Sequence, residues 1–110
     1  MATKPRKARH VLLANKSYGL YVGEVADDGE LGADGCRSIR VTNCRHVAHW
    51  RGKTGGITSL AAHGPCGPQK NLSRIGAPVP GASLLGGIVN IYDLTPEAVA
   101  AFASIVATDA

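Results

Sequence analysis

Glycine and proline are the residues that most limit what this chain can fold into. Fourteen glycines and six prolines occur among its 110 residues, a proportion that disfavours a helical bundle and suits short strands joined by tight turns. Apolar residues make up 45% of the chain, which is near the globular average and excludes a broadly disordered polymer. At this length we expect one folded domain with many turns.

The pattern of apolar residues predicts a small, mostly antiparallel sheet of about four to six strands. Two runs rich in Val, Leu and Tyr flank a polar break near the start of the chain, a composition typical of a hairpin. A turn at Asn43 separates the next two runs, and Gly86-Gly87 predicts a bulge in the last one. The expected strands are residues 10–15, 18–25, 37–42, 44–50 and 84–94.

The end of the chain carries the clearest helix signal. Thr95 suits the N-cap, Pro96 the first helical position and Glu97 the first turn, where an acid stabilises the helix dipole. We expect a helix from Pro96 to about Ala107 that packs on the sheet through Val99, Phe102, Ala103 and Val106. Residues 57–62 are an apolar island that fits either a strand or a single helical turn.

These elements predict an α+β fold with one C-terminal helix packed on the sheet. Residues 1–9 are polar and basic, and we expect a flexible arm there, followed by a single domain at 10–110. A sheet of this size leaves strand edges and one apolar face open, so we also expect a homo-oligomer.

Charge is distributed unevenly along the chain. Four of its twelve cations, Lys4, Arg6, Lys7 and Arg9, precede residue 10, and the remaining eight balance the eight acids. Five acids lie within residues 24–34, whereas residues 35–92 contain none. This basic segment carries Arg37, Arg40, Arg45, Arg51, Lys53, Lys70 and Arg74. Its arginines suit phosphate or carboxylate recognition, although the segment is equally well explained as a solvated face that pairs with the acidic stretch.

The glycine-rich loops of the basic segment have the ingredients of a nucleotide pocket. Glycine allows close approach of main-chain N–H groups to phosphate, and Arg or Lys supply charge. The candidate ligand-binding residues are Arg45, Trp50, Arg51, Lys53 and Arg74. Trp50 can stack on a base or pack in the core. An ordinary surface loop has the same composition.

Enzyme signatures are missing from the sequence. It has no paired carboxylates near the basic segment, no nucleophile elbow and no complete phosphate-binding loop, so we expect neither an enzyme nor a cofactor. Cys44, His46, His63 and Cys66 have the residue types of a zinc site without the usual paired knuckles, and we assign no metal. Three cysteines and no apolar run of membrane-span length predict a cytoplasmic protein with reduced thiols.

Several short phrases in the sequence resemble an uncharacterised family of short proteins encoded by tailed phages and prophages, a domain of unknown function. The phrases are His10-Val11-Leu12-Leu13, residues 18–24, Asn43-Cys44-Arg45, residues 56–65, Ser73-Arg74-Ile75-Gly76 and Gly87-Ile88-Val89. The resemblance spans roughly residues 10–97 and implies a viral setting and an α+β fold. It brings no known activity and no assigned site residues. By analogy, small phage proteins with basic, glycine-rich pockets include sponges that sequester nucleotide immune signals.

The leading functional hypothesis is therefore a non-enzymatic phage accessory protein, with a possible anti-defence role, that binds an anionic, phosphate-bearing ligand such as a nucleotide signal. The alternative is a nucleic-acid-binding or interaction protein that uses the basic arm, namely Lys4, Arg6, Lys7 and Arg9. Neither hypothesis involves a membrane.

Overall fold

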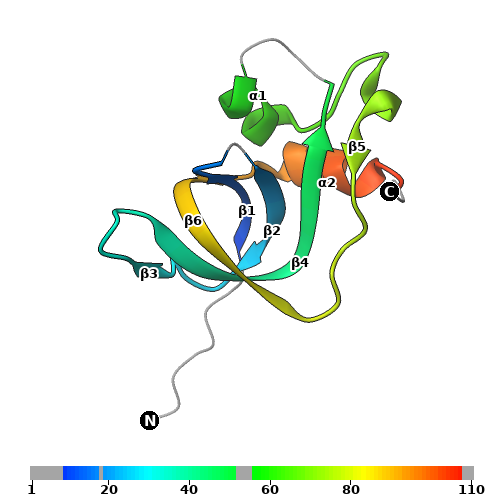
Figure 1. The fold of residues 1–110 in the computed structure, drawn as a ribbon. Helices are drawn as coiled ribbons and strands as arrows, with labels where there is room; N and C mark the ends of the chain where they lie inside the picture. The colour runs from blue at the N-terminus through cyan, green and yellow to red at the C-terminus, as the bar shows by residue number, and fades with distance from the viewer. Residues whose placement is uncertain (1–8, 18, 52–55, 108–110) are drawn as a thin grey trace.

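The computed structural model describes residues 9–17, 19–51 and 56–107, and Figure 1 shows how its elements are arranged. The hairpin expected near the start is confirmed, because the first two strands pair antiparallel. In chain order the elements are β1 (Arg9–Asn15), β2 (Leu20–Val25), β3 (Glu30–Leu31), β4 (Arg37–His49), α1 (Gly56–His63), the 3-10 helix η1 (Lys70–Leu72), β5 (Arg74–Ile75), β6 (Ala82–Asp93) and α2 (Pro96–Ser104).

Four of the strands close into a barrel. β1 pairs with β2 and β6, and β4 also pairs with β2 and β6, so the ladders form a circle in which every pair is antiparallel. The short strands β3 and β5 are added to β4 near its two ends. The expectation of a mostly antiparallel sheet is confirmed. The homo-oligomer was expected from open strand edges and one open apolar face; closure pairs most of the barrel edges, and the oligomeric state stays a prediction.

Two bulges bend the strands around the barrel. The strands expected at 37–42 and 44–50 are one 13-residue strand, β4, which bends at Asn43, where φ is 52°. Here β4 carries an extra residue relative to β2, since Val22 pairs with Arg45 and Glu24 with Thr42. The bulge predicted at Gly86-Gly87 is confirmed by the register shift between β4 and β6 and by a φ of 67° at Gly87, a value that glycine adopts without strain.

The apolar residues form two clusters on either side of the barrel wall. Val11, Leu13, Val25, Val41 and Ile88 come from all four barrel strands and fill the interior. The second cluster lies between the outer face of the barrel and the helices, and consists of Leu12, Val22, Val47, Leu60, Ala61, Ile75, Phe102 and Ile105. β1 contributes to both clusters, so it is buried on both faces.

Two helices, rather than one, cover the barrel. The island at 57–62 lies in α1, which ends at His63 and is followed by Gly64, where φ is 65°. A Cβ on Gly64 would lie 2.8 Å from the Cβ of Ala101, so this glycine allows α1 to approach α2 closely. α1 could not be assigned from the sequence because it is short and flanked by glycines. In the described part of the chain, neither helix has the length and apolar composition to cross a membrane.

α2 begins as predicted and ends earlier. The Thr95 hydroxyl accepts a hydrogen bond from the Ala98 main-chain N–H at 3.1 Å, as expected of an N-cap. The helix ends at Ser104, and the extended backbone of Ile105 turns that side chain inward. The buried side chains are therefore Ala98, Phe102 and Ile105. The predicted apolar face was wrong for Ala103 and Val106, which are exposed. Val106 lies beyond the end of the helix at Ser104, and Ala103 lies on the exposed side of the helix.

Candidate functional site

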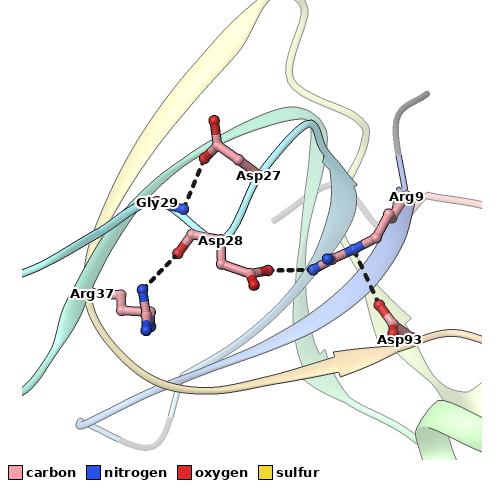
Figure 2. Close-up of polar contacts among 6 residues, drawn as sticks. All are labelled: Arg9, Asp27, Asp28, Gly29, Arg37 and Asp93. Carbon is pink, nitrogen blue, oxygen red and sulfur yellow. Dashed lines mark hydrogen bonds and ion pairs between the residues drawn. The ribbon is translucent and has the colours of Figure 1, made fainter. Parts of the chain in front are cut away.

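The acidic stretch at residues 24–34 pairs with cations near the start of the chain. Figure 2 shows Arg9 between the carboxylates of Asp28 and Asp93. The Oδ2 atom of Asp34 lies 3.9 Å from Nζ of Lys16, and Oε1 of Glu24 lies 3.5 Å from Nε2 of His10. Within the described residues, no ion pair joins an acid of this stretch to an Arg or Lys of the basic segment at 35–92. The interpretation of the basic segment as a face neutralised by the acidic stretch therefore has no support in these contacts.

Arg9 belongs to the barrel rather than to a flexible arm. It is the first residue of β1. The side chain of Asp27 accepts a hydrogen bond from the Gly29 N–H at 2.8 Å, and this fixes the turn that carries Asp28 (Figure 2). The hydrogen bond with Asp28 raises the pKa of Arg9. The other proposed nucleic-acid contacts, Lys4, Arg6 and Lys7, lie outside the described residues.

Arg45 has a structural role at the far end of α2. Its guanidinium donates hydrogen bonds to the main-chain carbonyls of Gly76 at 2.7 Å, Phe102 at 2.8 Å and Ile105 at 3.1 Å. Phe102 and Ile105 lie at the C-terminal end of α2, where carbonyl groups lack helical partners and a cation offsets the helix dipole. Burial lowers the pKa of Arg45. Because main-chain carbonyls occupy its guanidinium, Arg45 differs from the other candidate residues in its role.

Arg51 and Arg74 are brought together beside β5. Arg74 is the pairing partner of His49 across the β4–β5 ladder, next to a bulge between Val47 and His49. The Arg51 N–H donates to the hydroxyl of the buried Ser73 at 2.9 Å, which joins the end of β4 to the residue that precedes Arg74. The side chains of His49, Arg51 and Arg74 are exposed.

Lys70 adds a further cation to this region. It begins η1, and its carbonyl accepts a hydrogen bond from the Ser73 N–H at 3.0 Å. We name the exposed side chains of His49, Arg51, Lys70 and Arg74 the β5 basic surface. Within the part of the chain that the structure describes, Arg51, Lys70 and Arg74 form no ion pair. The predicted Lys53 lies outside that part.

The β5 basic surface contains two residues that we did not select from the sequence. His49 ends β4, and its place beside Arg51 in the sequence was the available signal. Lys70 stands in the basic segment, but nothing in the sequence placed it near Arg51, because that proximity depends on the turns between Pro65 and Ser73.

Trp50 is half-buried and packs against the cluster between the barrel and the helices. It precedes Arg51 and follows His49, whose side chains are both exposed. This position favours packing over base stacking for Trp50, since its side chain packs against the cluster that contains Leu60.

The cysteine and histidine residues that resembled zinc ligands lie in different surroundings. Cys44 is buried against the barrel interior, where burial raises the pKa of its thiol. The ring of His46 contacts Tyr21, with centroids 5.2 Å apart, and His63 lies 3.2 Å from Glu97. Among the described residues, no three His, Cys, Asp or Glu side chains are grouped so that they could hold a metal ion. The three cysteines are unpaired thiols.

Comparison with known proteins identifies a family and no activity. A family model described as a domain of unknown function (DUF6948) matches residues 8–102. This confirms the resemblance to an uncharacterised family and extends it over most of the chain. No curated protein and no solved structure matches the chain.

Proposed function

The chain belongs to the DUF6948 family, and we propose that it is a non-enzymatic protein that binds an anionic, phosphate-bearing ligand at the β5 basic surface. The observation that carries the proposal is the contrast in pairing. Arg9 is held between two carboxylates, whereas Arg51, Lys70 and Arg74 are exposed and have no acidic partner among the described residues.

The backbone around the β5 basic surface suits recognition of a phosphate. The hydrogen bond from Arg51 to Ser73 and the pairing of Arg74 with His49 fix the positions from which the two guanidinium groups extend. Guanidinium groups bind phosphate oxygens in a bidentate manner and keep their charge at every physiological pH. A ligand with two or more phosphate charges would engage both arginines, and a nucleotide signal is the ligand class that we favour.

The resemblance to phage and prophage proteins supports a finer form of the proposal. In that setting a small protein that binds a host nucleotide without converting it would act as a sponge, with an anti-defence role in the cytoplasm of the host. This form depends on the binding proposal and fails with it.

Calorimetry tests the binding proposal. A panel of cyclic and linear nucleotides is titrated into the full chain, into the double variant Arg51→Gln with Arg74→Gln, and into Arg40→Gln, a control that changes an exposed arginine within β4. We expect a nucleotide to bind the parent and the control equally, and the double variant to bind about tenfold or more weakly, as expected for the loss of charge-assisted contacts. Failure of every nucleotide to bind the folded parent at millimolar concentration would show that the proposal is wrong.

Nucleic acid is the second candidate ligand, because an exposed set of unpaired cations also suits a polyanion. On duplex DNA, affinity falls by about 0.9 decade per decade of salt for each phosphate that is neutralised. Removal of residues 2–8 shows which region binds DNA, the basic arm or the β5 basic surface. Loss of DNA binding with the fold intact supports the arm. Binding at the β5 basic surface survives the deletion and is lost in the double variant.

A further inference from the structure

One edge of β6 is left without a strand partner at the opposite end of β4 from the β5 basic surface. The ladder between β4 and β6 reaches the pair formed by Arg37 and Ile88, where β4 begins. β6 continues to Asp93 and pairs there with β1 alone among the described strands. Between Val89 and Asp93, no described strand therefore pairs with the edge of β6 that faces away from β1, and we call this stretch the free edge.

The direction of the main-chain groups on this edge follows from one hydrogen bond. The Leu94 N–H donates to the His10 carbonyl at 3.0 Å. Hydrogen-bonded and non-hydrogen-bonded pairs alternate along an antiparallel ladder. The main-chain groups of Tyr92 consequently face β1, and those of Ile91 and Asp93 face the free edge.

A hollow of about 370 Å³ lies against this free edge. Ile88, Val89, Asn90, Ile91 and Asp93 line it from β6, and Arg9, Asp28, Gly35 and Arg37 line the remaining sides. The edge from Val89 to Asp93 is about 14 Å long at the usual rise of an antiparallel strand, which is the length of a short extended peptide.

The two arginines of the hollow differ in their pairing. Arg9 donates to Asp28, and its Nε lies 3.2 Å from a carboxylate oxygen of Asp93, so one guanidinium contacts both carboxylates (Figure 2). Arg37 reaches the main-chain carbonyl of Asp28 at 3.5 Å, the outer limit of a hydrogen bond, and it forms no ion pair with any described residue. The half-buried Arg37 therefore keeps most of its donors for a ligand.

We propose that the hollow binds the C-terminal end of an extended peptide, which adds as a strand to the free edge of β6 and places its terminal carboxylate on Arg37. Strand addition supplies main-chain hydrogen bonds, here from Ile91 and Asp93, and a charged group at the end of the site fixes the direction. Arg37 lies opposite Ile88, so the peptide runs from the Asp93 end toward the Ile88 end, antiparallel to β6. This site is distinct from the β5 basic surface.

Two-dimensional NMR tests this inference with N-acetyl tetra-alanine as the probe, in forms that end in a carboxylate or in a carboxamide. We expect the carboxylate form to shift the amide signals of Ile91 and Asp93 in a saturable manner, and the carboxamide to bind about tenfold more weakly because it lacks the charge for Arg37. In Arg37→Gln the two forms should bind equally, whereas Arg40→Gln, an exposed arginine of the same strand, should preserve the difference.

The same spectra show whether each variant is folded, and Arg37→Lys provides a second test because it keeps the charge and loses the planar fork. We expect this variant to bind the carboxylate form with an affinity between those of the parent and Arg37→Gln. The inference is wrong if the Ile91 and Asp93 signals do not move at about 20 mM peptide, a concentration that detects very weak binding. It is also wrong if the parent binds both forms equally, or if the shifts occur around Arg74.

Discussion

Arg9 of β1, which lies near the start of β4, and the arginines near the end of β4 have different partners. At its start, beside β3, the acidic turn around Asp28 lies next to Arg9, and two carboxylates share one guanidinium. At its end, beside β5, Arg51 and Arg74 extend from positions held by main-chain contacts and have no described acidic partner. The carboxylates of the acidic stretch thus form ion pairs with residues near the start of the chain, and among the described residues they form none with the basic segment.

The comparison teaches that an arginine's function follows from its partners rather than from its place in a basic run. Arg45 lies between the two ends, and main-chain carbonyls occupy its guanidinium. The basic segment therefore contains at least two kinds of arginine, one that holds the fold together and one that is available to a ligand. Substitutions at the two kinds should give different losses.

The largest effect is expected for Arg45→Met. The variant removes three hydrogen bonds and leaves the carbonyls of Phe102 and Ile105 without the cation that caps α2. We expect the free energy of unfolding to fall by about 3 kcal/mol, since a net contribution of order 1 kcal/mol accompanies each such bond. Urea denaturation measures it, with Arg51→Met as the matched control, expected to change stability by less than about 0.5 kcal/mol. Equal losses in the two variants would remove the distinction between the two kinds of arginine.

An intermediate effect is expected for Trp50→Ala. Full truncation of a buried aromatic costs about 3–5 kcal/mol, and because Trp50 is half-buried we expect a loss of about 2 kcal/mol. Thermal melts of Trp50→Ala and Trp50→Phe measure it, and the phenylalanine variant should recover part of the loss. An alanine variant that melts within about two degrees of the parent would contradict the packing role and return Trp50 to the ligand-binding residues.

The smallest effect is expected for Arg9→Met at the other end of β4. The side chain of Arg9 is 42% exposed, and an exposed ion-pair network contributes about 0.5 kcal/mol. The loss should disappear in about 1 M salt, where the Debye length is about 3 Å. Chemical denaturation by urea at low and high salt measures it. Lys16→Met is the control, because its pair with Asp34 is longer at 3.9 Å, and a salt-independent loss for Arg9 would indicate packing instead of charge.

Local features of the fold could be read from the sequence because they depend on neighbouring residues. The hairpin of β1 and β2, the bulge at Gly86-Gly87 and the cap at Thr95 each follow from a few adjacent side chains. Closure of the barrel could not be predicted, because the pairing of β2 with β4 depends on the bulge at Asn43, which the sequence presents as an ordinary turn.

The candidate site could be predicted only in part, because residue type can be read from the sequence and distant partners cannot. Arg51 and Arg74 were selected by residue type, and the structure places them together beside β5. Arg45 was selected on the same ground, but its role depends on carbonyls at Phe102 and Ile105, far along the chain. Arg37 belonged to the same basic run, and its relation to the free edge of β6 appears only when the barrel closes.

Barrel closure also determines the order in which the chain can complete its fold. The ladder between β1 and β6 joins Val11 to Asp93, residues near opposite ends of the domain. During synthesis β1 and β2 can pair as soon as they emerge, but the barrel interior stays open until β6 has left the ribosome. The entropy of closing so long a loop is lost before the last ladder forms, which makes this a slow-folding topology for its size. Until β6 pairs, the side chains of Val11 and Leu13, which fill the barrel interior in the folded protein, are exposed to solvent or to a chaperone.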